Sequence, residues 1–156
     1  MSIENVKIYL KNYKKDGEVR EFAVSSATVE LAAKALNTEP ARIAKTLSFK
    51  VADRVILVVA AGDVKIDNKK FKSFFGFKAK MLDYAEVELL TGHVVGGVCP
   101  FALPEGVEVY TDVSLARFDT VFPACGSPNS AIELTCEELY KISNSAGWID
   151  VCSIKK

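Results

Sequence analysis

A glycine-rich segment at positions 91–101 (Thr-Gly-His-Val-Val-Gly-Gly-Val-Cys-Pro-Phe) carries residue types that could bind a small polar ligand. Glycine reaches positive φ and has no Cβ, so the main-chain N–H groups near Gly96 and Gly97 could point at a ligand. Pro100 fixes its own φ and favours an extended Cys99, which stiffens one end of the segment. Spacing alone favours a tight turn between two elements, so ligand binding needs support from the rest of the sequence.

A lysine among apolar neighbours is the second candidate for chemistry. Lys45 lies in the stretch 42–49 (Arg-Ile-Ala-Lys-Thr-Leu-Ser-Phe), where a turn is predicted to lead into a strand. Its ammonium group either reaches along the surface to water or is held as a charge in a cleft, and the local sequence favours the surface. A nucleophile pair of Cys99 and His93 is a third candidate. No carboxylate or amide is clearly placed to orient the imidazole, so the pair is disfavoured.

Composition and charge exclude several classes of protein. The 156 residues suit one domain, with 49% hydrophobic and 26% charged residues, as is ordinary for a globular protein. Twenty basic and twenty acidic residues cancel, so a nucleic-acid contact needs a local basic patch. No apolar run could span a membrane and no signal peptide precedes the first polar residues, so a cytoplasmic protein without a membrane partner is expected.

Metal ligands are too scattered to predict a metal site. His93 is the single histidine, and the cysteines form no C-x-x-C pair. A disulfide framework is not expected in a cytosolic chain of this size. The four cysteines are Cys99, Cys125, Cys136 and Cys152.

A lysine-rich run lies between positions 65 and 80. Its first members are Lys65, Lys69 and Lys70, and the acidic residues close to them in the sequence are Asp63 and Asp67. Such a run is most often a solvated helix face, but it could also follow a phosphate backbone. The sequence leaves both interpretations open.

The hydrophobic pattern predicts the elements that must position these residues. Positions 55–61 are apolar on both faces, as is typical of a central strand, and they pair with 46–51 across Ala52 and Asp53. Helices are predicted within 2–16, 28–37, 67–76, 83–92 and 135–147, with Phe71, Phe74 and Phe75 pointing inward. Further strands are predicted at 19–24, 79–82, 107–112, 120–124, 131–134 and 148–152. Single helices without strict β-α alternation predict one α/β domain, 1–156, with a mixed, mostly antiparallel sheet and surrounding helices.

Several of these stretches, taken in order, resemble the YbaK/EbsC family. Its members are free-standing relatives of the editing domain inserted in bacterial prolyl-tRNA synthetase. The resemblance rests on Thr-Val-Glu-Leu-Ala-Ala at 28–33, Ile-Ala-Lys-Thr-Leu at 43–47, Ala-Gly-Asp at 61–63 and the segment 91–101. It continues through Val-Tyr-Thr-Asp at 109–112, Ala-Cys-Gly-Ser-Pro at 124–128 and Glu-Leu-Thr at 133–135. It therefore covers nearly the whole chain.

The resemblance implies a trans-editing deacylase that hydrolyses the ester of a mischarged aminoacyl-tRNA with no metal or other cofactor. The lysine matching Lys45 is the key site residue in that family, and the G-x-x-x-P segment cradles the aminoacyl end. The expected partners are mischarged tRNA, held by the patch of Lys65, Lys69 and Lys70, and a synthetase, but no DNA. The residues expected to bind the substrate are Thr46, Gly96, Gly97, Val98, Cys99, Pro100 and Ser127.

Two positions depart from the cysteine-removing members of the family. Those members carry a serine and an aspartate where this chain has Ala124 and Ala131, so cysteine is not the expected amino acid. The sequence also leaves open a second function class, a non-catalytic module of the same fold that binds tRNA ends or a synthetase. Lys45 and the intact glycine-rich segment favour the enzyme.

Overall fold

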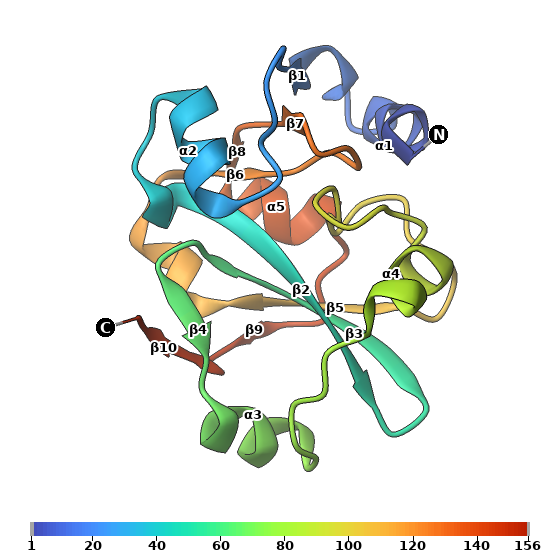
Figure 1. Cartoon of the computed structure of the whole chain (residues 1–156), viewed down its shortest axis with the longest axis vertical. Helices are drawn as coiled ribbons and strands as arrows, with labels where there is room; N and C mark the ends of the chain where they lie inside the picture. The colour runs from blue at the N-terminus through green and yellow to red at the C-terminus, as the bar shows by residue number, and fades with distance from the viewer. Residues whose placement is uncertain (1, 156) are drawn as a thin grey trace.

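The apolar strand β3, Arg54–Ala61, lies in the middle of a six-stranded sheet in the order β8-β6-β2-β3-β5-β9 (Figure 1). This is a computed structural model, and it describes residues 2–155. Residues 56–61 of β3 are completely buried, because neighbouring strands cover both edges and side chains cover both faces. The prediction of a central strand at this position is confirmed.

The elements follow the chain in the order expected from the sequence. The α-helices are α1 Ser2–Lys11, α2 Val29–Leu36, α3 Asn68–Phe75, α4 Tyr84–Thr91 and α5 Cys136–Ile142. Short 3-10 turns are η1 Asp16–Glu18, η2 Pro40–Arg42 and η3 Val113–Arg117. The strands besides β3 are β1 Arg20–Glu21, β2 Ile43–Val51, β4 Val64–Ile66, β5 Glu108–Asp112, β6 Thr120–Pro123, β7 Ser130–Ala131, β8 Leu134–Thr135, β9 Trp148–Ile149 and β10 Cys152–Ile154. No helix within residues 2–155 is long and apolar enough to cross a membrane.

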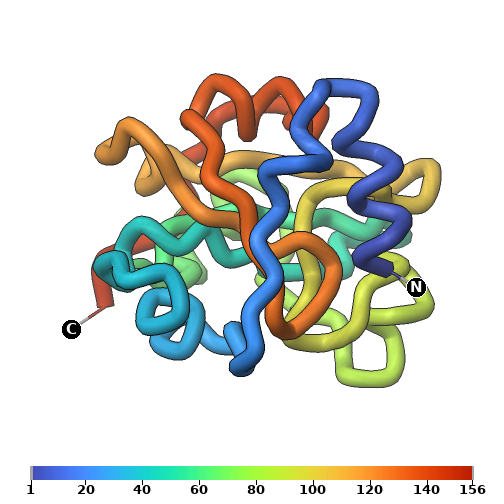
Figure 2. Tube along the Cα trace, turned by 90° about the horizontal axis from the view of Figure 1, so that it is seen from above, coloured from blue at the N-terminus to red at the C-terminus, as the bar shows by residue number. Residues whose placement is uncertain are grey.

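The sheet is mixed, and most of its paired residues are antiparallel, as predicted. The longest pairing is the hairpin of β2 and β3, which runs from Ala44 opposite Ala61 to Val51 opposite Arg54. Strands β6, β5 and β9 join in parallel, while β8 joins antiparallel. Two small antiparallel pairs, β1 with β7 and β4 with β10, lie beside the main sheet. In the view of Figure 2, β1 (blue) crosses the centre of the molecule next to the orange segment that contains β7.

Local capping signals set the starts of α4 and α5 and the ends of α2, α3 and α4 where the sequence placed them, whereas α1 ends at Lys11, five residues before the predicted turn at Asp16. Helices α4 and α5 begin with complete capping boxes, in which the side chains of Asp83 and Thr135 each accept an N–H three residues on. Helices α2, α3 and α4 end at residues with positive φ: Asn37, Gly76 and Gly92.

Elements that depend on distant partners differ from the sequence prediction. The predicted strand 79–82 is a single bridge between Met81 and Phe49, and the predicted strand 19–24 shortens to β1. The predicted strand 131–134 divides into the end of β7 and the start of β8. The last helix ends at Ile142, five residues before Gly147.

Two further predictions are corrected at the far side of the sheet. The predicted strand 148–152 is two strands in two sheets, because the buried carboxylate of Asp112 accepts Val151 N–H and turns the chain between them. Phe74 is 52% exposed rather than buried. Helix α3 faces the sheet with Phe71 and Phe75, which are four residues apart, so Phe74 lies at the edge of that face.

Candidate active site

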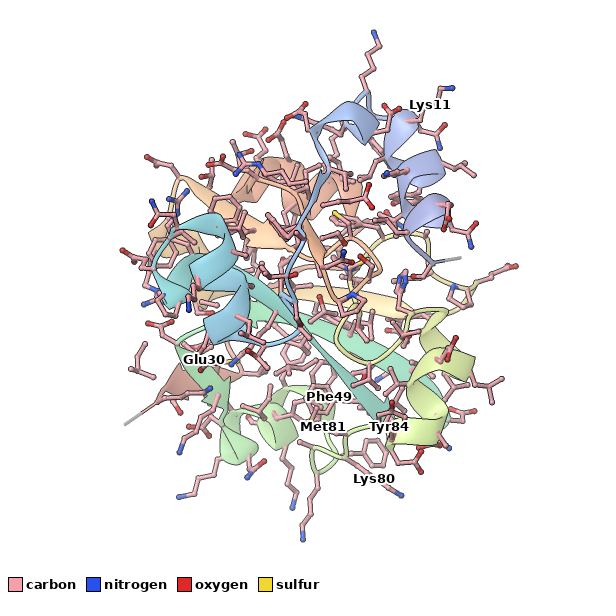
Figure 3. All side chains as sticks on the ribbon, turned by 45° about the horizontal axis from the view of Figure 1, so that its top comes forward. Lys11, Glu30, Phe49, Lys80, Met81 and Tyr84 are labelled. Atoms are coloured by element: carbon pink, nitrogen blue, oxygen red, sulfur yellow. The ribbon has the colours of Figure 1, made fainter. Side chains whose placement is uncertain are left out.

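A cavity of about 420 Å³ opens along β2 and has that strand as its floor. Residues 43–48 of β2 line it together with side chains from four other parts of the chain. The remaining lining residues are Ser26, Ala27, Thr28, Val29 and Ala32 around the start of α2; Met81, Leu82, Tyr84 and Val87 around the start of α4; Val95, Gly96 and Val98; and Phe122, Ala124, Ser130 and Ala131. In Figure 3, the labelled Met81 and Tyr84 lie close to Phe49 of β2, at the end of the molecule where α4 begins. None of the lining residues is acidic.

The cavity forms because one edge of β2 is covered only at its two ends. At the far end, Lys50 N–H donates to Lys80 O at 2.9 Å and Leu82 N–H donates to Ser48 O at 3.1 Å. In a strand, the N–H and C=O of one residue point to the same side, and successive residues alternate sides. The N–H and C=O groups of the even-numbered residues of β2 therefore point away from β3, and those between the two covered ends face the cavity.

Thr46 lies in the gap between the two covered parts of this edge. Strand β6 pairs with β2 only at Ile43 and Ala44. The pairings of β2 therefore leave the main-chain N–H and C=O of Thr46 without a partner within residues 2–155. The Thr46 hydroxyl oxygen is also buried without a hydrogen bond, the only such side-chain atom found in that part of the chain. A buried hydroxyl without a partner costs free energy, and the strand edge beside it carries a free donor and a free acceptor, so the three groups together indicate a ligand site.

Part of the glycine-rich segment forms one wall of this cavity. Gly96 and Val98 line it, as expected. Gly96 has a φ of +92°, and a Cβ there would lie 3.0 Å from the Cβ of Ala27. Gly96 therefore packs directly against the residue before the N-cap of α2, with no room for a side chain between them.

The rest of the segment, with Ser127, lies behind the wall and corrects the expectation that all of it contacts the cavity. Gly97, Cys99 and Pro100 are buried and do not line the cavity. A Cβ on Gly97 would lie 2.7 Å from the main-chain nitrogen of Ser127, so the two loops touch backbone to backbone. The Ser127 hydroxyl donates within its own turn, to Asn129 and to Ser130. These residues lie behind the wall and do not line the cavity.

Lys45 lines the same cavity as Gly96, although its ammonium group points elsewhere. The side chain is half-buried, and its Nζ donates to the main-chain oxygen of Val64 on β4. Burial lowers the pKa of Lys45, and the positive charge of Lys155 lowers it further. The structure thus brings Lys45 and Gly96 to one cleft, and the ammonium group contacts β4 rather than the glycine-rich segment.

Cys99 and His93 are close together, but their environment opposes nucleophilic chemistry. Cys99 Sγ lies 3.5 Å from His93 Nε2, and both side chains are almost fully buried. His93 Nε2 is 2.7 Å from the Phe101 main-chain oxygen, which can only accept, so Nε2 carries the proton and cannot take one from the thiol. Burial raises the pKa of Cys99 to about 12. The pair is part of the core, with Ser2 of α1 bonded to the other ring nitrogen.

The three lysines of the expected RNA patch lie outside the cavity. Lys65, on β4, and Lys69, on α3, are exposed and have no ion pair within residues 2–155. The ammonium group of Lys70 already has two partners, since its Nζ donates to Asp150 at 3.0 Å and to the Cys152 main-chain oxygen at 2.9 Å. Within the same residues, no group of three or more His, Cys, Asp or Glu side chains could hold a metal ion, and all four cysteines are free thiols.

Sequence reasoning missed several residues that line the cavity. Ser48 is two positions after Thr46, so strand alternation could have placed it on the same edge and face. Tyr84 is 80% exposed at the first position of α4, and Thr28 is the N-cap of α2. Sequence signals at these positions predict that a helix begins there, but they do not indicate that the beginning of the helix lines a cavity.

Comparison with known proteins identifies the family. The profile of the aminoacyl-tRNA editing domain matches residues 24–142, most of the chain and all of the cavity lining. The chain belongs to this family. The resemblance to YbaK/EbsC proteins is thereby confirmed.

Individual relatives of this editing-domain protein include free-standing chains and parts of larger ones. It is 58% identical over 153 residues to "Uncharacterized protein YwhH" of Bacillus subtilis (strain 168), covering 97% of this chain and 98% of that protein. It is 30% identical over 115 residues to a proline–tRNA ligase of Bacillus cytotoxicus, covering 71% of this chain and 20% of the ligase. The editing-domain protein therefore spans about a fifth of that ligase. A crystal structure of a proposed trans-editing enzyme for prolyl tRNA synthetase superposes with a TM-score of 0.88 at 26% identity, covering 97% of each chain.

Proposed function

We propose that this protein is a trans-editing deacylase that hydrolyses the ester between a wrong amino acid and its tRNA, without a metal. The observation that carries the proposal is the cavity at the open edge of β2, where unpartnered polar groups of Thr46 meet Lys45 and Gly96. Membership of the editing-domain family and the similarity to a proposed trans-editing enzyme support the same reaction.

An aminoacyl ester is already activated towards hydrolysis, so the protein does not need to supply a covalent nucleophile. A water oxygen attacks the ester carbonyl carbon, the bond to the ribose oxygen breaks, and the water's protons end on the ribose hydroxyl and the carboxyl group. The site must hold the ester and the water in place and stabilise the negative charge that develops on the carbonyl oxygen. Lys45 supplies a positive charge for the phosphate or for this oxygen, after its ammonium group leaves the Val64 carbonyl.

Selection of the amino acid follows from the shape and polarity of the walls. Ala124 and Ala131 line the cavity at the positions where cysteine-removing relatives carry polar side chains. A methyl group there offers no hydrogen bond to a thiol, so we propose an edited amino acid other than cysteine. A cognate amino acid would be excluded by size, which is how a pocket rejects a substrate larger than itself.

The deciding experiment is a panel of mischarged tRNAs tested for deacylation with the wild type and with Lys45→Ala. The variant should remain folded and lose about 10²–10³-fold in rate, the usual effect of removing one preorganised charge-stabilising group. Lys45→Arg should not restore the rate, because a planar guanidinium differs in shape from an ammonium. Lys50→Ala is the matched control, since Lys50 is on the same strand, exposed, and outside the cavity.

The alternative function is a non-catalytic module that binds tRNA ends or a synthetase. A folded Lys45→Ala protein that deacylates every tRNA at the wild-type rate would refute the editing proposal. If the wild type deacylates nothing but binds tRNA, the binding module is the better description.

A further inference from the structure

Along the uncovered part of the β2 edge, both main-chain groups of Thr46 and the N–H of Ser48 have no partner within residues 2–155, whereas the Ser48 C=O accepts from Leu82. The two groups of Thr46 have the hydrogen-bonding pattern of a β-bridge. Thr46 presents one donor, its N–H, and one acceptor, its C=O, side by side on the floor of the cavity. In an antiparallel sheet, a residue in this position exchanges both bonds with a single residue opposite. A ligand that satisfies Thr46 must therefore carry one acceptor and one donor with the spacing of a single extended residue.

An aminoacyl group has this arrangement. In an extended aminoacyl ester, the amino nitrogen and the carbonyl oxygen lie on the same side of the Cα atom, as in a strand residue. The ammonium group would donate to Thr46 C=O, and Thr46 N–H would donate to the ester carbonyl oxygen. An ionised phosphate offers only acceptors, so it could bond to the Thr46 N–H but not to the Thr46 C=O.

The lining determines which atoms could accept a hydrogen bond from an amino group, since its single charged residue is Lys45. A protonated amino group in a protein site usually meets a carboxylate, but no aspartate or glutamate lines this cavity. The acceptor that the open edge of β2 offers is the main-chain oxygen of Thr46, which has no partner within residues 2–155. A carbonyl oxygen that no other group occupies can accept a charged hydrogen bond without first losing another partner.

We infer that the aminoacyl residue at the tRNA end docks on Thr46 as a one-residue antiparallel strand, which makes the free amino group a requirement for binding. The inference rests on the proposed function and specifies how its substrate is held. The same bridge polarises the ester carbonyl through Thr46 N–H, so recognition of the amino group and activation of the ester occur on one residue. The amino acid side chain then projects on the same sheet face as the Thr46 side chain, as cross-strand neighbours do.

The test compares two non-hydrolysable probes with the same carbon skeleton. Both are adenosines with a 3′-amide in place of the ester; one carries an alanyl group and the other a propionyl group, which lacks only the amino group. The alanyl probe should bind about 10- to 100-fold more tightly in a titration followed by NMR, the effect of one charged hydrogen bond. Hydrogen exchange at the Thr46 amide should be fast in the free protein and slow in the alanyl complex.

Two variants separate the main chain of Thr46 from its side chain. Thr46→Val removes the hydroxyl but keeps the N–H and C=O, so it should still prefer the alanyl probe. Thr46→Pro removes the N–H at an edge position where proline is tolerated, and it should bind both probes more weakly. The exchange measurement on the wild type needs neither variant, so misfolding of Thr46→Pro leaves the inference testable.

The outcomes distinguish this inference from the proposed function. Equal binding of the two probes, no binding of either, or unchanged exchange at Thr46 on binding would each overturn the docking mode. If one of these is found while the wild type still deacylates a tRNA in the panel, the function stands and the aminoacyl group is held in another way. If both probes bind as expected but no tRNA is deacylated, the docking mode stands for a binding module.

Discussion

Replacing Gly97 by alanine should destabilise the protein and distort the cavity wall, although Gly97 itself contacts no ligand. A Cβ at this position would lie 2.7 Å from Ser127 N and 2.8 Å from both Ser127 Cα and Gly126 C. Ordinary contacts of this kind are longer than about 3.4 Å, and the three atoms belong to the main chain, so a side-chain rotation cannot relieve them. Forced overpacking of this type costs about 1–3 kcal/mol.

In a domain of this size, that loss should lower the midpoint of thermal unfolding by roughly 2–12 °C. Gly17→Ala is the matched control, because a Cβ at Gly17 meets nothing within 4 Å. The control should leave the midpoint unchanged or raise it slightly, since alanine restricts the unfolded chain. Deacylation by Gly97→Ala, measured well below its midpoint, should also fall, because Gly96 and Val98 move with the displaced loop. Equal midpoints for the two variants would refute the packing argument, and equal activity would show that the wall tolerates the shift.

Three further predictions concern the core, the surface and pH. Cys99→Ala should keep most of the deacylation activity and lose about 1–2 kcal/mol of stability from the small cavity it leaves; complete loss of activity in a folded variant would restore the nucleophile hypothesis. Charge reversal at Lys69 should weaken tRNA binding and reduce the slope of log K against log salt by about 0.7–0.9. Charge reversal at Lys70 should weaken binding less, because Lys70 already pairs with Asp150. Unchanged binding by both variants would show that the patch is only a solvated face. The Arg117 guanidinium beside Asp63 lowers the pKa of that carboxyl below its ordinary 3.8, so the pair stabilises the fold above that pH and the contribution is lost as pH falls through the folded pKa. Asp63→Asn should therefore flatten the acid side of the stability profile, and an unchanged profile would contradict the assignment.

The parts of the fold that were predictable from sequence are those whose cause is local. The helix starts at Asp83 and Thr135 follow from capping residues within one turn, and the central strand follows from seven consecutive apolar positions. The split after Ile149 was not predictable in the same way, because it depends on a hydrogen bond from Val151 to Asp112, 39 positions away.

The same division applies to the candidate site. The glycine-rich segment and Lys45 were recognisable as residue types, and the structure places both at one cavity. The open edge at Thr46 has no local signal, because it exists only where two unrelated segments stop covering β2. The burial of Cys99 and the bond from Lys45 to Val64 also depend on packing that single positions do not encode.

Gly62 sets a limit on how the chain can vary in length. A Cβ at this residue would lie 2.1 Å from the Pro40 main-chain oxygen, so the turn before β2 touches the end of β3 with no room between them. An inserted residue in that turn could not bulge towards β3 and would instead displace the start of the cavity floor. At Gly17 and Gly147, by contrast, nothing lies within 4 Å of the position a Cβ would take. Insertions and deletions that preserve the cavity are therefore confined to such open loops.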